Sequence, residues 1–329
     1  MNSKARVEAA LRGDKVDRPP AGAWGHTYRE EWSPEELAAV TVERARRFGW
    51  DFVKLQPRAT FFAEAFGNRY HPAGHRLRGP ILDEAVVPDL GSWERLRLVE
   101  PSLLAEQNRA LALVVKELGP DVPVIQTVFS PASVASYLVA RDSRRLVREL
   151  RTRPELVVPA LERVQDALID FARGAVAAGA AGIFYAISHL ATPDVMPLEV
   201  YEELLLPMDL RLLDSLPASA WFNAVHLCGG RQYFEIAKKF PVQAVSYSIH
   251  SRGNLPLARV QEITGKAVMG GLEQRRVLAG GPAAAIREQV AEAIADTGGR
   301  GLLLAPGCSV PPRARPENLA VMSGAAAAV

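Results

Sequence analysis

The chain has 329 residues, 48% of them hydrophobic, with 39 basic and 37 acidic side chains and a formal net charge of +2. This is enough to bury one large core, and a single α/β barrel of about 250 residues or more fits the length. The balanced charge argues against a nucleic-acid or anionic-membrane partner, because no sustained basic run is present to neutralise phosphates.

No run of 18 apolar residues predicts a membrane span, and residues 1–10 lack the apolar core of a signal peptide. We therefore expect a cytoplasmic protein without a membrane partner. The chain has only two cysteines, Cys228 and Cys308. In a reducing compartment such a pair is more often metal-binding, catalytic or simply buried than joined in a structural disulfide.

Short apolar runs alternate along the chain with amphipathic helical stretches, which is typical of a parallel sheet with helical crossovers. A helix is predicted first, over residues 4–11. Eight apolar runs then predict strands at 22–25, 52–55, 122–129, 182–187, 220–225, 244–248, 267–270 and 301–304. Helical patterns lie between most of them, at 34–48, 144–178, 200–215, 231–239 and 282–296.

Eight strands with helical crossovers favour a closed (β/α)8 (TIM) barrel over an open doubly wound sheet. No Gly-x-Gly-x-x-Gly follows the first strand, which weakens the dinucleotide-binding alternative. Residues 1–20 are expected to form an N-terminal extension. The stretch 55–120 after the second strand is rich in proline and glycine, and we interpret it as an elaborated excursion over the barrel mouth. No linker divides the chain, so one domain over residues 1–329 is predicted.

The strongest chemical signal is the segment Val225-His226-Leu227-Cys228-Gly229-Gly230, which follows the fifth predicted strand. Cys308 likewise follows the eighth strand. Active-site side chains of a barrel lie at the C-terminal ends of its strands, so all three are expected at one cleft. Zinc takes thiolate and imidazole ligands, and a catalytic site keeps one position for substrate. Alternatively the three residues are unrelated, because a buried cysteine also behaves as a small hydrophobic residue.

The fourth zinc ligand stays open. His250 ends the sixth predicted strand and is a candidate to bind zinc, to orient another ligand or to touch substrate. Glu273, at the end of the seventh strand, is a weaker candidate for the same roles. Candidate contacts to substrate or cofactor follow the first and fourth strands, and they are His26, Tyr28, Arg29 and His189.

At these residues the chain resembles the uroporphyrinogen decarboxylase superfamily, and the resemblance spans nearly the whole chain. It implies a (β/α)8 barrel with its site at the C-terminal mouth. The matching segments are Arg18-Pro19-Pro20, Gly49-Trp50-Asp51-Phe52, residues 129–138, residues 178–183, His226-Leu227-Cys228-Gly229, Gly270-Gly271-Leu272-Glu273, residues 307–311 and Pro316-Glu317-Asn318.

The true decarboxylases of this superfamily resemble one another at three places. They have an arginine-bearing segment after the first strand, an aspartate after the second, and a late Gly-His-Gly. Here the first segment has one arginine, Arg29, where two are expected, and residues 53–62 contain no aspartate. Cys308 stands where the histidine is expected. These departures argue against porphyrinogen decarboxylation.

Another branch of the superfamily consists of zinc methyltransferases that move a methyl group between a corrinoid protein and a thiol. They share a His-x-Cys followed much later by a Cys. The resemblance therefore implies zinc held by His226, Cys228 and Cys308. It also implies a corrinoid supplied by a partner protein, and a small thiol or methylated substrate, with the direction of transfer open. Two alternatives remain: a uroporphyrinogen decarboxylase or close tetrapyrrole-acting relative, and a non-catalytic zinc- or tetrapyrrole-binding barrel.

Overall fold

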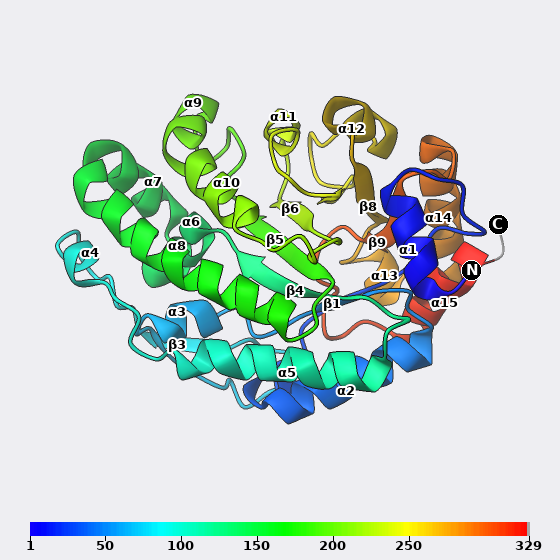
Figure 1. Cartoon of the computed structure of the whole chain (residues 1–329), viewed down its shortest axis with the longest axis horizontal. Coiled ribbons are helices and arrows are strands. Elements are labelled where there is room, and N and C mark those ends of the chain that lie inside the picture. The colour runs from blue at the N-terminus through cyan, green and yellow to red at the C-terminus, as the bar shows by residue number, and fades with distance from the viewer. Residues whose placement is uncertain (328–329) are drawn as a thin grey trace.

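A curled parallel sheet of seven strands lies at the centre of the protein, and its computed structural model describes residues 1–327. Each strand pairs in parallel with its neighbour, in the order β1-β4-β5-β6-β7-β8-β9, and helices cover the outer face (Figure 1). The predicted barrel class is confirmed. The strands are β1 Val53–Leu55, β4 Val124–Phe129, β5 Gly182–Ser188, β6 Ala224–Cys228, β7 Ala244–Ser246, β8 Ala267–Leu272 and β9 Leu302–Pro306.

Residues 20–24 occupy the eighth position, between β9 and β1. The N–H of Gly22 donates to the carbonyl of Leu304 at 3.1 Å, and the N–H of Asp51 donates to the carbonyl of Ala21 at 2.8 Å. Only a single parallel bridge, Ala21 with Leu304, forms here. The predicted regular strand at 22–25 is therefore wrong. Pro19 and Pro20 precede the bridge and lack the N–H that a ladder needs.

Helices follow the predictions most closely where capping residues mark their ends. Ser33 caps the start of α2, Pro34–Phe48, by accepting from the N–H of Glu36 at 3.3 Å, and Gly49 ends the helix in the left-handed region at φ 62°. The helices longer than seven residues are α1 Ser3–Leu11, α2 Pro34–Phe48, α5 Ser102–Leu118, α6 Pro131–Leu138, α7 Ser143–Thr152, α8 Pro154–Ala177, α10 Leu206–Asp214, α12 Leu257–Thr264, α14 Ala283–Thr297 and α15 Pro316–Ala327. The shorter ones are η1 Glu30–Trp32, α3 Phe61–Ala65, α4 Ser92–Arg95, α9 Leu198–Val200, η2 Tyr201–Leu205, α11 Phe234–Ala237 and α13 Val277–Gly280.

Several predicted boundaries need correction. The helix predicted over 144–178 is two helices, α7 and α8, because Pro154 restricts the residue before it and begins a new helix. The helix predicted over 231–239 forms only over α11. The strand predicted over 220–225 starts later, as β6, so that His226 and Cys228 belong to the strand itself.

The excursion after β1 contains α3, an antiparallel hairpin of β2 Arg69–His71 and β3 Ile81–Glu84, then α4 and α5. The hairpin loop packs against Tyr28, since a Cβ at Gly79 would lie 3.3 Å from the Tyr28 ring. Tyr28 follows the barrel-closing segment, so the excursion reaches the mouth of the barrel as predicted.

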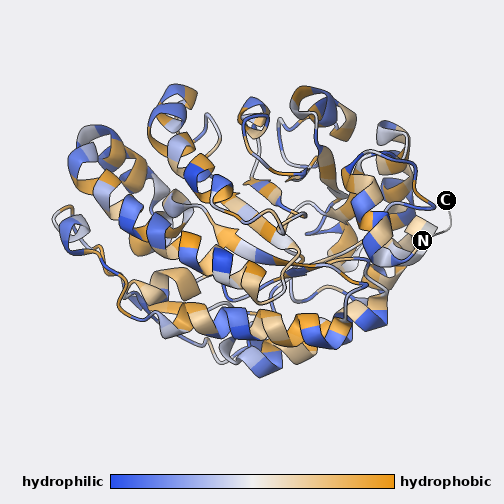
Figure 2. Cartoon of the chain, in the orientation of Figure 1, coloured by the Kyte–Doolittle hydropathy of each residue, from blue (hydrophilic) through white to orange (hydrophobic). Residues whose placement is uncertain are grey.

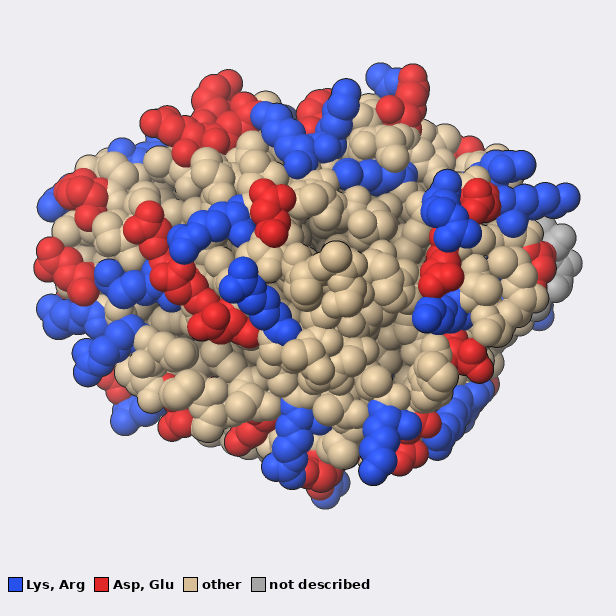
Figure 3. All heavy atoms as spheres, in the orientation of Figure 1, with Lys and Arg blue, Asp and Glu red and all other residues tan. Residues whose placement is uncertain are grey.

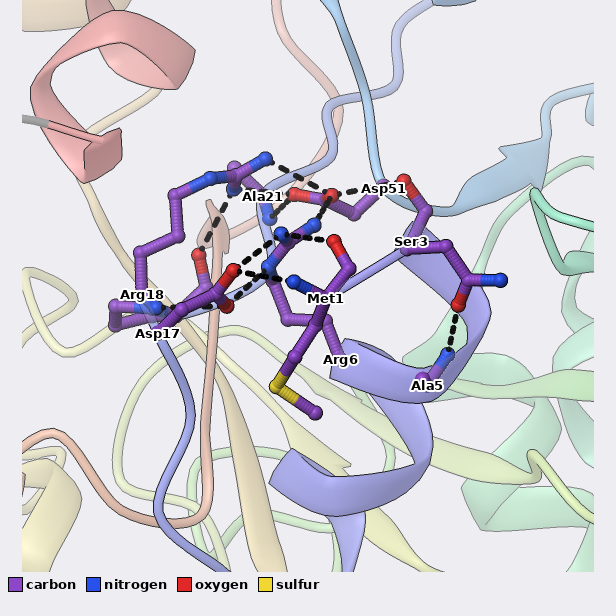
Figure 4. A network of polar contacts seen from close by, with 10 residues as sticks. Met1, Ser3, Ala5, Arg6, Asp17, Arg18, Ala21 and Asp51 are labelled. Atoms are coloured by element: carbon purple, nitrogen blue, oxygen red, sulfur yellow. Dashed lines mark hydrogen bonds and ion pairs between the residues drawn. The ribbon is translucent and has the colours of Figure 1, made fainter.

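A buried carboxylate ties the N-terminal extension to the start of β1 (Figure 4). Asp51 is 1% exposed and accepts from Arg6 at 2.6 Å, from Arg18 at 2.6 Å and from the N–H of Ala21 at 2.9 Å. Asp17 completes the network, and its hydrogen bond from Arg6 holds the pKa of its carboxyl well below the ordinary range. The two arginines therefore hold α1 against the edge where the barrel closes.

Apolar residues of the strands and helices form the buried core. Along the helices, hydrophobic and hydrophilic residues alternate (Figure 2). Every residue of β4 and β8 is buried, as expected for parallel strands covered on both faces. Acidic and basic side chains are interspersed over the face drawn in Figure 3. Among residues 1–327, no helix is long and apolar enough to cross a membrane.

Candidate metal centre and its cavity

Strands β6 and β9 carry a histidine and two cysteines to one point. His226 and Cys228 are two residues apart on β6, so their side chains leave the same face of the strand. Cys308 lies two residues beyond the end of β9. One ligand atom from each of the three lies within 4.8 Å of the others, and no second group of this kind occurs among the residues described.

The spacing of the two sulfur atoms fits a metal better than a disulfide. They are 3.9 Å apart. Two sulfurs about 2.3 Å from one tetrahedral zinc ion would be separated by about 3.8 Å, whereas a disulfide needs about 2.05 Å. The donor set of two thiols and an imidazole is also one that zinc prefers. The residues present therefore fit a zinc ion.

Neighbouring side chains hold the imidazole of His226. Its Nδ1 lies 3.1 Å from the hydroxyl of Ser246 on β7, and its ring stacks on Phe184 of β5 with centroids 5.1 Å apart. A partner at one ring nitrogen fixes the orientation of the other for a ligand. Contact with Cys228, and then with His226, lowers the pKa of Cys308 well below its ordinary value, whereas the same contact raises the pKa of Cys228, so without a metal the thiolate form is favoured at Cys308 alone.

The three residues line a cavity of about 340 Å³ at the barrel mouth. Two basic side chains, Lys54 and Arg141, line it, and no carboxylate does. The cavity therefore favours an anionic or electron-rich ligand. Its remaining walls are Trp24, His26, Gln56, Ala59, Thr127, Phe129, Ser136, Tyr137, Ser143, Phe184, Ala186, Ser188, His189 and Ser309.

Lys54 projects from β1 into the cavity although only 5% of the residue is exposed. Burial lowers the pKa of its amine to about 7, against a smaller opposite effect of Cys308. Its Nζ donates to Oε1 of Gln56 and lies 4.8 Å from the ring centroid of Phe184. A buried amine with one hydrogen-bond acceptor has further donors available for a ligand.

Backbone strain gathers at the same mouth. Arg141 and His189 line the cavity with φ values of 66° and 58°, and Ala140 has a φ of 57°. Residues other than glycine rarely adopt this left-handed region, and strain of this kind tends to gather at functional sites. The Arg141 guanidinium lies 5.2 Å from the Tyr137 ring and makes no ion pair with any residue in the described range.

The sequence matches the uroporphyrinogen decarboxylase family over residues 2–329. The chain belongs to this family. Similar proteins include the "Methylcobamide:CoM methyltransferase MtaA" of Methanosarcina barkeri, 28% identical over 69% of each chain. MtbA of Methanosarcina acetivorans, named likewise, is 25% identical over 97% of this chain and 96% of its own. A uroporphyrinogen decarboxylase of Alkalilimnicola ehrlichii is 29% identical over 54% of each.

A solved structure, a methyltransferase from Methanosarcina mazei, has the same fold. Its TM-score is 0.83 at 24% identity, covering 99% of this chain and 98% of its own. The two chains therefore share one fold along nearly their whole length.

In this member of the uroporphyrinogen decarboxylase family, the predicted contact residues divide between two hollows. His189 lies at the candidate metal centre, with Nε2 3.5 Å from the sulfur of Cys228. His26 lines the same cavity and stacks on Tyr28, with ring centroids 4.9 Å apart. Tyr28 and Arg29 instead line a neighbouring hollow against residues 72–80.

The structure does not bring the two candidate fourth ligands to the centre. His250 is exposed, and its Nε2 lies 3.1 Å from the carbonyl oxygen of Gly271. Glu273 accepts from the backbone N–H groups of Arg275, Arg276 and Val277 at 2.7 to 3.0 Å. Its carboxylate therefore stabilises a turn after β8.

Sequence reasoning missed Lys54, Gln56 and Arg141. Lys54 alternates with the apolar Val53 and Leu55 in a strand predicted to be buried, and a charge in that position was a usable signal. Gln56 follows directly at the strand end, where barrel sites form. Arg141 belongs to a basic stretch that is typical of a solvated helix face, and its φ value is not readable from composition.

Proposed function

We propose that this protein is a zinc-dependent methyltransferase that moves a methyl group between the cobalt of a corrinoid protein and the sulfur of a small thiol. The observation that carries this proposal is the convergence of His226, Cys228 and Cys308 with a sulfur–sulfur separation of 3.9 Å. These three side chains would hold the ion, and the fourth position is left for substrate.

The relatives support this proposal over decarboxylation. The named methyltransferases act on a methylcobamide and CoM by their names, and one of them aligns with nearly all of this chain. The features of true decarboxylases are missing: Cys308 replaces a histidine, and no aspartate follows β1. A metal site with thiolate ligands is suited to binding a substrate thiol for methyl transfer. Such a site has no evident role in removing a carboxylate from a tetrapyrrole.

The chemistry that zinc supplies when bound is to lower the pKa of a coordinated substrate thiol. The protein's own residues position the rest of the substrate. Arg141 places a positive charge on the cavity wall, Lys54 adds an amine that donates hydrogen bonds, and Phe129 and Tyr137 supply aromatic surface. His189, which directly follows β5, contacts the proposed metal ligand Cys228, with its Nε2 3.5 Å from the sulfur.

The corrinoid is proposed to come from a partner protein that docks over the barrel mouth. The sequence contains no Asp-x-His-x-x-Gly motif for binding a corrinoid of its own. The direction of transfer depends on which substrate arrives methylated, and the same cavity serves both directions.

The test is a methyl-transfer assay with purified, zinc-loaded protein. Methylcobalamin is mixed with 2-mercaptoethanesulfonate or homocysteine, and loss of the cobalt–methyl absorbance is followed together with formation of the thioether. We expect turnover that disappears in Cys308→Ala. Full activity in zinc-free Cys308→Ala protein would end this proposal. Conversion of uroporphyrinogen to coproporphyrinogen in a parallel reaction would favour the decarboxylase instead.

A further inference from the structure

A histidine paired with a buried carboxylate lies on the wall of the cavity, just after the segment that closes the barrel. Nδ1 of His26 lies 2.9 and 3.1 Å from the two carboxylate oxygens of Glu31. The N–H of Thr27 donates to the same carboxylate at 2.7 Å. Glu31 is 1% exposed, and His26 is its only ion-pair partner within residues 1–327.

Hydrogen bonding around Gln56 fixes which nitrogen of His26 carries the proton. The amine of Lys54 and the hydroxyl of Ser309 both donate to Oε1 of Gln56. The amide nitrogen of Gln56 must then face Nε2 of His26, 3.3 Å away, as a donor. Nε2 is therefore an acceptor with a lone pair, and the proton of the neutral imidazole is on Nδ1, where it is donated to Glu31.

This arrangement is that of a general base with an orienting carboxylate. The lone pair of Nε2 lies on the side of Gln56, which contacts Ser309 next to Cys308. The contact from Gln56 is long for an N–H donor and therefore weak. A substrate that enters the cavity can replace it at Nε2.

The donor set at the metal centre explains why a base is needed there. A zinc ion held by two thiolates would lower the pKa of a thiol in its fourth position, though by less than an ion with neutral ligands would, and the released proton would need an acceptor. A thiol with an ordinary pKa of about 8.5 still carries its proton at neutral pH. That proton needs an acceptor inside a cavity that contains no carboxylate on its wall.

We propose that His26, oriented by Glu31, accepts the proton of the incoming thiol; this inference rests on the proposed function. The S–H bond breaks, an N–H bond forms at Nε2, and the electron pair stays on sulfur. The same pair then forms the bond to the methyl carbon, while the cobalt–carbon bond of the corrinoid breaks with its electrons left on cobalt.

Several other charged or titratable groups lie around His26. Only Glu31 contacts Nδ1 of His26, so a substitution of Glu31 is the most direct way to alter the orientation and basicity of the imidazole. The others are Tyr28 stacked on the ring, Lys54 beyond Gln56, Cys308 across the cavity, and Glu43 and Arg44 of α2 in a hollow behind residues 23–26.

The first experiment compares His26→Gln and Glu31→Gln with His250→Gln, a histidine near the mouth that lies outside the cavity wall. Methyl transfer from methylcobalamin is measured from pH 6 to 10, with zinc content as a check on the site. At pH 7 we expect His26→Gln to lose about 100-fold in rate. The loss shrinks to a few-fold above the pKa of the thiol in solution, because the thiolate then arrives already formed. The control stays within about twofold.

The second experiment reads thiol binding without any corrinoid. In Co²⁺-substituted protein, the sulfur-to-cobalt absorption band reports the bound thiolate. His26→Gln protein must release the thiol proton to solvent, so its affinity should rise about tenfold per pH unit below the thiol pKa. Wild-type affinity should change less, because the proton stays on His26.

Parallel pH profiles in the variant and the wild type would overturn the role of His26. If the wild type binds thiol and transfers no methyl group, the proposed function fails, whereas the binding profile still decides the role of His26. Should His26→Gln lose its metal, Glu31→Gln gives the same comparison, because it keeps the shape of the carboxylate and removes its charge.

Discussion

The sulfur atoms of Cys228 and Cys308 lie 3.9 Å apart, although 80 positions of sequence separate the two residues. They come from β6 and from the loop after β9, which are three positions apart in the sheet order. Curvature of the sheet brings them together. With His226 they form a preorganised site, so a metal ion that binds there needs little rearrangement of the protein.

Removing one member of this group should remove the metal. We expect Cys308→Ala and His226→Ala to retain less than about a tenth of the zinc of the wild type, because three protein ligands become two. His250→Ala is the matched control and should keep the full equivalent. Elemental analysis after dialysis measures this, and one equivalent of zinc in Cys308→Ala would contradict the assignment.

Lys54→Met should make the protein more stable at neutral pH. Burial lowers the pKa of Lys54 to about 7, whereas an unfolded chain has a lysine pKa of about 10.4. The free energy of unfolding is therefore highest above the unfolded-state pKa of lysine. It decreases as the pH falls from there through 7, because the unfolded chain takes up a proton that the folded protein does not. Each pKa unit corresponds to about 1.4 kcal/mol. We therefore expect a gain of a few kcal/mol at pH 7 that vanishes near pH 10.5.

Urea unfolding from pH 7 to 10.5 measures the Lys54→Met effect. Lys116→Met, at an exposed position on α5, is the control and should change little at any pH. A stability difference for Lys54→Met that does not shrink with rising pH would count against a buried, neutral amine.

Asp209 predicts the opposite dependence on pH. Burial raises the pKa of this carboxyl to about 7, and Tyr185 donates to it at 2.6 Å while Tyr201 donates to its other oxygen. The pKa of an aspartate in an unfolded chain is about 3.9. The contribution of Asp209 to the free energy of unfolding is therefore fully present below pH 4 and is lost as the pH rises through 7.

Asp209→Asn keeps a neutral side chain of the same shape at every pH. Thermal unfolding of the wild type should therefore show a loss of stability between about pH 4 and 7 that is smaller in the variant. Superimposable pH profiles of the melting temperature would show that the carboxyl is already ionised in the folded protein.

Asp51→Asn should weaken the attachment of the N-terminal extension. Arg6 and Arg18 would both lose a buried anionic partner, and breaking such a pair costs about 3–5 kcal/mol. Asp14→Asn removes an exposed partner of Arg12 in the same segment and should cost less than about 1 kcal/mol. Equal midpoints of urea unfolding for the two variants would contradict this difference.

Hydrophobic periodicity and end signals in the sequence determine most of the elements of this protein. The bounds of α2 follow from Ser33, Pro34 and Gly49, because capping is a local interaction between neighbours in the chain. The same local logic fails at residues 22–25. There the apolar pattern predicts a strand, yet the ladder depends on N–H groups that prolines remove, and on partners nearly 300 residues away.

The sequence by itself also predicts the chemical type of the candidate site, since a histidine and two cysteines at strand ends indicate a thiolate–imidazole metal centre. Only the tertiary structure decides which other groups join them. It brings Lys54 and His26 to the cavity and leaves His250 outside, because curvature of the sheet and loop packing set these distances. Composition and spacing carry no information about contacts between residues so far apart in the chain.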